Sequence, residues 1–283
     1  MSVSLTKEQA KQKVSKANHE LKPWIRRFGR FGYMAKGTVY VLLGLLAAMA
    51  AFGIGGKVTG TNGVLQSIAA VPFGEVLLWL IGIGLLGYII WQIIKAIKDP
   101  ENKGHDAKGI ITRAAYLVSA IIYGSLAFSA FKLALHAGHA GGGSEQTISA
   151  NLLSKPFGQW IVGLVGAIII GYGVHEILSG VKEKFMKKFK VSEMNEHETK
   201  IARNSGKIGL LSRGIVLGMI GVFLIKTAVT ADPNQTKGLG GALSELAKQP
   251  YGLWLLGIVG LGLMLYGVYG IIRGRYEHFN FGR

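Results

Sequence analysis

Polar and ionisable side chains recur at equivalent places in three apolar stretches of this sequence, and they are the residues most able to do chemistry. The places are defined by their distance from the prolines at positions 72, 156 and 250. Side chains sixteen, nineteen and twenty residues after each proline share one helical face, because residues three and four apart are neighbours on a helix. These positions hold Tyr88, Trp91 and Gln92 in the first stretch, Tyr172, His175 and Glu176 in the second, and Tyr266, Tyr269 and Gly270 in the third.

Glu176 is the most informative of these side chains, because an ionisable residue inside an apolar segment is costly unless it pairs or meets water. A carboxylate beside a histidine can exchange a proton near neutral pH, and His175 precedes Glu176 in the chain. Lys36 stands six residues after Arg30 in a segment that runs the other way, which places it at a similar depth. We expect a Lys36–Glu176 ion pair if the first and fourth membrane helices touch, with Gln92 close by.

Two interpretations of this cluster stay open at this point. The residues handle a proton or a cation, or they form a structural ion pair whose basic member reaches toward the nearby water interface. The three equivalent tyrosines likewise either line a pathway, or anchor the helices at the interface and bond to neighbouring helices.

The segments that must position these residues are long enough to cross a bilayer, which takes about 20 apolar residues per helix. Their whole circumference is apolar and the polar residues lie between them, which argues against a soluble core. The sequence therefore predicts an all-α integral membrane protein with six transmembrane helices. We expect these at residues 33–52, 74–94, 114–135, 157–178, 209–229 and 251–272.

The six segments form three tandem repeats, each a two-helix hairpin with a Pro-aromatic-Gly motif before its second helix. Short helices are expected at the hairpin tips, because the apolar stretches before each proline are too short to span. Repeated units that cannot bury their own surface pack against one another, so we expect a pseudo-threefold arrangement. The predicted divisions are a basic N-terminal arm (1–26), repeat 1 (27–104), repeat 2 (105–190), a linker (191–206), and repeat 3 with a short tail (207–283).

The distribution of positive charge predicts an orientation. The chain carries 32 Lys and Arg against 15 Asp and Glu, a net charge of +17, and 25 of the 32 lie in alternate connections. By the positive-inside rule, both termini lie in the cytoplasm of a multi-pass protein of the plasma (inner) membrane. A nucleic-acid partner is not expected, since no basic folded surface with groove-reading elements is evident.

Basic residues at the cytoplasmic helix ends are expected to contact anionic lipid headgroups. One group is the arginine that we place at the start of each repeat, and the other is a lysine-rich stretch with Phe185 and Phe189, expected to lie on the lipid surface. These candidates are Arg30, Arg113, Arg213, Lys182, Lys184, Lys187 and Lys188.

Several activities are disfavoured by the composition. The chain contains no cysteine, which excludes thiol catalysis and thiolate metal sites. Paired carboxylates, a nucleophile beside a base and an HExxH pattern are not seen. We therefore expect no cofactor, no metal site and no enzymatic activity.

The three tandem units, with Arg30-Phe31-Gly32-Tyr33 at the start of the first and a tyrosine after each Pro-Phe/Tyr-Gly, resemble a bacterial membrane family known as domain of unknown function 1206. The similarity covers about residues 27–279. The second and third units depart from the opening motif, with Arg113-Ala114-Ala115-Tyr116 and Arg213-Gly214-Ile215-Val216. The resemblance implies an architecture but no activity.

Parallel repeats often create a site where the copies meet. The expected function is therefore a small channel or transporter for a small solute, an ion or a proton. The alternative is a non-transporting protein that binds lipid or acts as a scaffold through its basic face. A homo-oligomer or a membrane partner is compatible with both.

Overall fold

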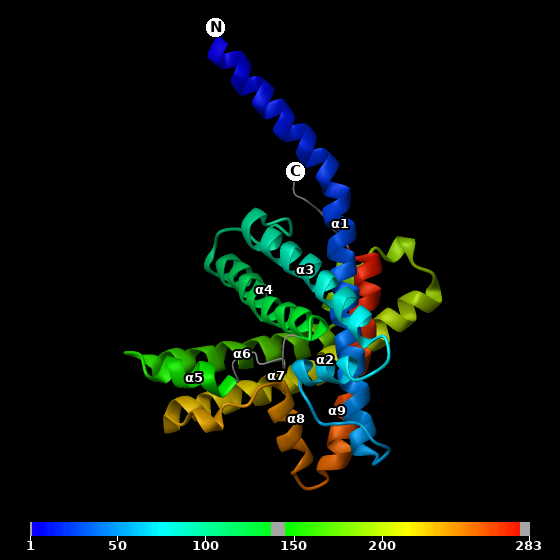
Figure 1. Ribbon diagram of the computed structural model, residues 1–283, viewed down its shortest axis with the longest axis vertical. Helices are drawn as coiled ribbons and strands as arrows, with labels where there is room; N and C mark the ends of the chain where they lie inside the picture. The colour runs from blue at the N-terminus through cyan, green and yellow to red at the C-terminus, as the bar shows by residue number, and fades with distance from the viewer. Residues whose placement is uncertain (1, 137–144, 278–283) are drawn as a thin grey trace.

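The computed structural model is a bundle of long helices (Figure 1). It describes the backbone of residues 2–136 and 145–277, and the side chains of residues 23–106, 109–136 and 145–277. Within these residues, six helices are long and apolar enough to cross a membrane, which confirms the predicted all-α membrane fold. They are α1 (Ser2–Ala51), α3 (Gly74–Lys98), α4 (Ala107–Ala134), α6 (Gly158–Val181), α7 (Glu196–Thr230) and α9 (Gly252–Tyr276).

The predicted segments match these helices closely, except at the beginnings of α1, α4 and α7. The arm expected at residues 1–26 runs into α1 without a break. In the range predicted as a linker, α7 already begins at Glu196. The reason is a capping box: the Asn195 side chain accepts from the Glu198 N–H at 2.8 Å, and the Glu198 carboxylate accepts from the Asn195 N–H at 3.1 Å.

Short helices occupy the connections within and between the repeats. At the hairpin tips lie α2 (Thr61–Ala69), α5 (Glu145–Leu153) and α8 (Leu239–Ala247), as expected. Single-turn 3-10 helices are η1 (Lys184–Lys188), η2 (Val191–Glu193) and η3 (Pro233–Gln235). We call the end of the bundle with α2, α5 and α8 the hairpin end, and the end with residues 95–106 and 182–195 the basic end.

The Pro-aromatic-Gly motif forms the same tight turn in all three repeats. The proline lies outside the helix, which begins only at the glycine. A Cβ atom on this glycine would clash with a carbonyl oxygen of the preceding short helix. At Gly74 the distance between these two atoms would be 1.9 Å. The aromatic residue adopts a left-handed conformation and is exposed in each copy: Phe73, Phe157 and Tyr251 have φ of 62°, 62° and 59°.

The spanning helices pack in a ring that is open at one edge. The order of contact is α6, α7, α9, α1, α3 and α4, so that the second helix of each repeat packs on the first helix of the next. Within repeats, α1 packs on α3 and α7 on α9, whereas α4 and α6 barely touch within the described residues. Figure 1 shows α6 and α7 running together, away from α3 and α4.

Pairs of glycines set the register of two of the interfaces between repeats. Gly37 of α1 packs on Gly267 of α9, where an added Cβ would lie 2.6 Å from the Gly267 carbonyl oxygen. Gly214 of α7 packs in the same way on Gly173 of α6, at 2.7 Å. Gly267 and Gly173 both stand seventeen residues after the proline of their repeat, so Gly37 and Gly214 are equivalent positions.

This register corrects the sequence alignment of the third repeat. Because Gly37 and Gly214 are equivalent, Arg213 corresponds to Lys36, and the counterpart of Arg30 is Lys207. An alignment of Arg213 with Arg30 is therefore wrong by six residues. Periodic, glycine-rich helices offer several similar alignments, and only the close approach of the backbones distinguishes them.

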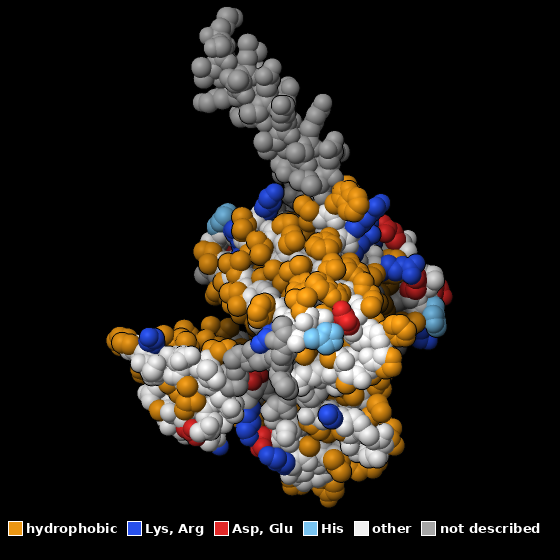
Figure 2. Space-filling view, viewed as in Figure 1, with side chains coloured by type: hydrophobic (Ala, Val, Ile, Leu, Met, Phe, Trp, Pro, Cys, Tyr) orange, Lys and Arg blue, Asp and Glu red, His pale blue; other side chains and the backbone are white. Residues whose placement is uncertain are grey.

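The outer surface is apolar, as expected for helices in lipid. Figure 2 shows hydrophobic side chains over the face formed by α3 and α4. On α4, Ile121 and Phe128 are 72% and 68% exposed. The buried core lies between α1, α3, α4 and α9, where tyrosines and leucines pack together.

Candidate functional site

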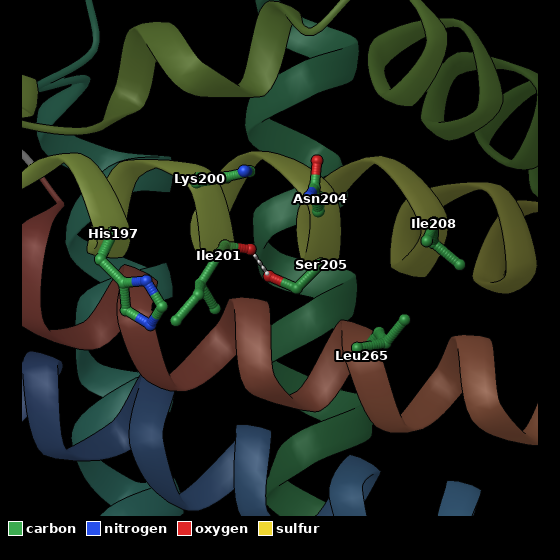
Figure 3. Close-up of a pocket in the computed structure, with 7 residues that line it drawn as sticks. All are labelled: His197, Lys200, Ile201, Asn204, Ser205, Ile208 and Leu265. Carbon is green, nitrogen blue, oxygen red and sulfur yellow. Dashed lines mark hydrogen bonds between the residues drawn. The ribbon is translucent and has the colours of Figure 1, made fainter.

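An open pocket near the basic end does not contain the predicted polar residues. Figure 3 shows it along α7, with the Ser205 hydroxyl donating to the Ile201 carbonyl at 2.6 Å. Its lining residues are His197, Lys200, Ile201, Asn204, Ser205, Ile208 and Leu265. The candidate site is instead a set of buried side chains inside the bundle.

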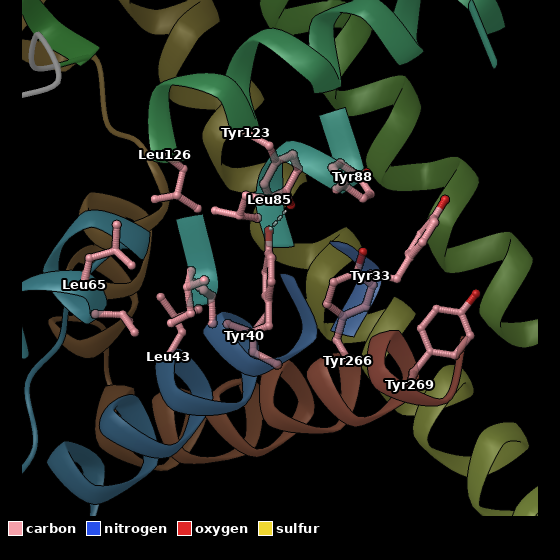
Figure 4. Packing of buried hydrophobic residues seen from close by; sticks show 14 of the residues in the cluster. Tyr33, Tyr40, Leu43, Leu65, Leu85, Tyr88, Tyr123, Leu126, Tyr266 and Tyr269 are labelled. Atoms are coloured by element: carbon pink, nitrogen blue, oxygen red, sulfur yellow. Dashed lines mark hydrogen bonds between the residues drawn. The ribbon is translucent and has the colours of Figure 1, made fainter. Parts of the chain in front are cut away.

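Tyrosines from four helices form the centre of this site. Tyr40 of α1 and Tyr266 of α9 meet edge to face with ring centres 4.9 Å apart, and Tyr88 of α3 meets Tyr123 of α4 at 4.8 Å. The Tyr123 hydroxyl donates to the Tyr40 hydroxyl at 3.3 Å. Figure 4 shows these rings grouped beside a layer of leucines. We call Tyr40, Tyr88, Tyr123 and Tyr266 the tyrosine cage.

The tyrosine cage surrounds the ammonium group of Lys36. The Lys36 Nζ atom lies 4.8 Å from the ring centre of Tyr123 and 4.9 Å from that of Tyr88. It lies 5.5 Å and 6.0 Å from those of Tyr266 and Tyr40. It also donates to the Tyr88 hydroxyl at 3.3 Å, and the residue is only 8% exposed. Lys36 therefore lies in the interior of the bundle.

Glu176 does not pair with Lys36. Its carboxylate pairs with the guanidinium of Arg213, and both side chains are buried. The expected Lys36–Glu176 pair required contact between α1 and α6, which share no substantial interface within the described residues. Instead α6 packs on α7 along the Gly173–Gly214 contact, which brings Arg213 to Glu176.

Arg213 is also surrounded by tyrosines, which makes it a structural counterpart of Lys36. Its guanidinium carbon lies 4.9 Å from the ring centre of Tyr266, and 5.7 Å and 5.9 Å from those of Tyr172 and Tyr40. Its expected role as a lipid-headgroup contact is therefore wrong. The arginine that seemed to begin the third repeat lies six residues, about 1.7 helical turns, beyond Lys207, the true counterpart of Arg30.

The same pattern continues in the second repeat. Ser119 stands six residues after Arg113, as Lys36 does after Arg30, and the Ser119 hydroxyl bonds to that of Tyr88 at 3.1 Å. The side chains at the Lys36 position of each repeat therefore alternate with the tyrosines that stand sixteen residues after each proline. The order is Tyr88 between Lys36 and Ser119, Tyr266 between Lys36 and Arg213, and Tyr172 beside Arg213.

The two other predicted members of the cluster lie apart from its centre. His175 is exposed, and its ring stacks on that of Tyr172 at 6.5 Å. Tyr172 itself is 43% exposed, because α6 lacks a packing partner on the side toward α4. Gln92 is buried, and its Oε1 atom has no hydrogen-bond partner among the described residues.

A second buried polar network lies toward the basic end and was missed in the sequence. The Lys95 ammonium donates to the Tyr33 hydroxyl at 3.1 Å and lies 3.6 Å from the Glu101 carboxylate. The Arg273 guanidinium donates to the same Tyr33 hydroxyl at 3.4 Å and pairs with Glu277. Lys95 and Arg273 both stand twenty-three residues after a proline, on the face already singled out, so repeat spacing could have found them.

Glu101 connects this network to the loop after α3. Its carboxylate accepts from the Tyr116 hydroxyl at 3.0 Å and lies 3.4 Å from the Lys103 ammonium. Burial raises the pKa of Glu101, but the surrounding cations, led by Lys95 and Lys188, lower it to about 2. Glu101 therefore stays ionised at neutral pH.

The lysine-rich segment before α7 docks on the bundle with its aromatic side chains. Phe185 and Phe189 are buried against the ring of Tyr269, with ring centres 5.4 Å and 5.7 Å away. The Lys190 N–H donates to the Tyr276 carbonyl at 2.9 Å. The expectation that these phenylalanines lie on the lipid surface is wrong, because Gly206 of α7 leaves space for the Phe185 ring.

The other residues expected at lipid headgroups divide into two groups. Lys182, Lys184, Lys187 and Lys188 are exposed at the basic end. Arg113 is half-buried and donates to the carbonyls of Ala96 and Ile97 at 2.7 Å and 3.1 Å, so it caps the end of α3. Arg30 is half-buried near the start of the spanning part of α1.

Comparisons with known proteins agree with this register. A family model described as Domain of Unknown Function (DUF1206) matches residues 31–99, 114–183 and 208–277. Lys36, Ser119 and Arg213 each stand five residues after the start of a matched range. "Uncharacterized protein YxxB" of Bacillus subtilis (strain 168) is 48% identical over 265 residues, which cover 94% of this chain and 96% of that protein. No solved structure matches the chain.

Proposed function

The chain belongs to the DUF1206 family, and we propose that it is a small membrane transport protein, a channel or a carrier, for a small solute, an ion or a proton. The observation that carries the proposal is the charge of the buried site. Glu176 neutralises Arg213, whereas no carboxylate lies within 4.0 Å of Lys36 among the described residues. An ionisable group at such a depth is costly and marks a functional site by default.

Lys36, and not Glu176, is therefore the residue that we assign to charge exchange. A carboxylate held by an arginine keeps its charge, because arginine is not deprotonated in proteins. A lysine held by aromatic rings and one hydroxyl has no such fixed partner. It can lose and regain a proton, or give way to another cation, without leaving an opposite charge unpaired.

We further propose that the basic end faces the cytoplasm, in the inner membrane, with both termini on that side. The excess of Lys and Arg in the connections at this end supports the orientation. The chain has no cysteine, so single cysteines can be introduced at Asn102 and at Lys57 without interference. In intact cells, an impermeant maleimide should label the cysteine at position 57 but not that at position 102; the reverse pattern would refute this orientation.

Flux in liposomes tests the transport proposal. Purified wild type, Lys36→Met and Lys184→Met are reconstituted and screened against protons, small cations, anions and neutral solutes. We expect wild type and the exposed-site control Lys184→Met to support the same flux, and Lys36→Met to lose at least tenfold. A wild type without any flux would refute transport, and an active Lys36→Met would refute the assignment of Lys36.

A second candidate function is lipid binding or scaffolding at the basic end. It is favoured by the exposed lysines of η1 and its neighbours, which Phe185 and Phe189 hold in a fixed position on the bundle. This alternative predicts that Lys182, Lys184 and Lys187 changed together to Gln release anionic lipid, as seen by native mass spectrometry. It also predicts that Lys36→Met retains that lipid.

A further inference from the structure

We infer that the tyrosine cage is a binding site for an organic ammonium ion, and that the Lys36 ammonium fills this site while the ligand is absent. The inference rests on the proposed transport function and names the class of its substrate. It assigns the site to primary or quaternary ammonium compounds, whose charge is carried by a nitrogen of the same kind as the lysine Nζ.

The geometry of the tyrosine cage is the first reason. Four aromatic rings from four helices lie within 6.0 Å of one nitrogen position. Groups of aromatic rings around a cation are the usual means by which proteins recognise ammonium ligands, since the ring face carries negative potential. Tyr40, Tyr88, Tyr123 and Tyr266 come from α1, α3, α4 and α9, so the site lies where all three repeats meet.

The weakness of the other contacts of Lys36 is the second reason. The Nζ atom has three donor hydrogens, and its one hydrogen bond among the described residues is a long one of 3.3 Å to the Tyr88 hydroxyl. No carboxylate lies within 4.0 Å of it among the described residues. The rings therefore supply most of what holds the ammonium, and an external ammonium would meet the same rings.

The charges near Lys36 favour replacement of its ammonium by the ligand cation over binding of both cations at once. Arg213 of α7, Arg273 of α9 and Lys95 of α3 act on its ammonium as like charges, and Glu176 of α6 as the opposite charge. The nearest groups from α1, α3, α4 and α9 are the rings of the tyrosine cage and the Tyr88 hydroxyl, with Ser119 beyond Tyr88. A ligand cation can enter when Lys36 releases its proton to water, so the charge of the site is unchanged.

Chemical replacement of the lysine side chain tests the inference directly. Lys36→Ala removes the side chain beyond Cβ, and n-propylammonium has the same heavy atoms as the part removed. Thermal unfolding of this variant in detergent at pH 7 is measured with n-propylammonium chloride and, separately, with 1-propanol, a neutral molecule of the same size. Leu43→Ala is the matched control, since it removes a buried side chain of the same helix, from the layer of leucines beside the tyrosine cage, and keeps Lys36.

We expect n-propylammonium, at about ten times its dissociation constant, to raise the Tm of Lys36→Ala by about 2 to 4 °C. It should raise the Tm of wild type and of Leu43→Ala by a smaller amount, because the ligand must displace the Lys36 ammonium in both, and 1-propanol should not reproduce the effect. A Tm of Lys36→Ala that rises no more with n-propylammonium than with 1-propanol would overturn the inference. If Lys36→Ala does not fold, Lys36→Ser with ethylammonium is the substitute, because the second repeat carries Ser119 at this position.

The experiment separates this inference from the transport proposal, because it requires no flux. Ammonium binding without any flux in liposomes would refute transport and leave the site assigned. Flux of other solutes without ammonium binding would refute the ligand class alone.

Discussion

The carboxylate of Glu176 pairs with the guanidinium of Arg213, and these two residues come from different repeats. Arg213 occupies in the third repeat the position that Lys36 occupies in the first. Two of the three equivalent positions therefore hold a cation inside the bundle, and among the described residues only one of these cations has a carboxylate partner. This asymmetry is the reason we propose the charge-exchanging role for Lys36.

Removing one member of the Glu176–Arg213 pair is expected to destabilise the protein strongly. The side chains are 7% and 12% exposed, so Glu176→Ala leaves a buried guanidinium without its counter-charge. Loss of one partner of a buried pair costs about 3 to 5 kcal/mol. The measurement is the free energy of unfolding in mixed micelles.

Two further variants check the cause. Glu176→Leu combined with Arg213→Met should recover most of the lost stability, because no charge is then left unpaired. Glu193→Gln should change little, because the Lys190–Glu193 pair is exposed. An unstable double variant would mean that packing, and not charge, explains the loss.

Glu101 is expected to make the stability depend on acidic pH. Its folded-state pKa of about 2 lies below the usual value of 4.5, so the ionised form stabilises the fold above about pH 4.5. This contribution, up to about 3 kcal/mol, is lost as the pH falls from about 4.5 to about 2. Glu101→Gln should therefore lower the Tm at pH 7 but differ little from wild type at pH 2.

The comparison for Glu101 is the exposed pair of Glu183 and Arg203. Glu183→Gln should leave the Tm nearly unchanged at both pH values, since exposed pairs contribute little. A Glu101→Gln variant that is as stable as wild type at pH 7 would contradict the proposed electrostatic network.

Phe185 is expected to hold the lysine-rich segment on the bundle. The side chain is 2% exposed and packs on Tyr269, and Phe→Ala in a core costs about 3 to 5 kcal/mol. In Phe185→Ala, trypsin should therefore cleave faster after Lys184 and Lys187. Val191→Ala, at a 45% exposed position in the next turn, is the control; equal cleavage of the two variants would argue against docking through Phe185.

The close packing of α1 on α9 is expected to require glycine at position 44. A Cβ there would lie 2.3 Å from the Gly260 carbonyl oxygen and from the Met264 backbone nitrogen, so the two helices must separate. Gly44→Ala should cost about 1 to 3 kcal/mol, as overpacking does. Gly218→Ala should be neutral or stabilising by up to about 1 kcal/mol, because nothing lies within 4 Å of its Cβ position. Similar Tm values for both variants would show that the glycine contacts do not set this interface.

Much of the candidate site could be located from the sequence, but its pairing could not. Spacing from the prolines places Tyr88, Tyr266 and Gln92 on inward faces, and the structure buries all three. The same spacing places His175 and Tyr172 inward, yet both are exposed, because repeat 2 lacks the packing of α4 on α6 that would cover them. Equivalent positions in a repeat need not have equivalent surroundings.

The sequence by itself determined the six spanning helices, the hairpin tips and the threefold repetition, because segment length, hydropathy and turn residues are local properties of the chain. Only the tertiary structure decided that Arg213 corresponds to Lys36, that Glu176 pairs with Arg213, and that the ring is open between α4 and α6. The physical reason lies in how helices associate in lipid. No hydrophobic force acts between apolar helices there, so partner and register depend on where small residues let two backbones approach.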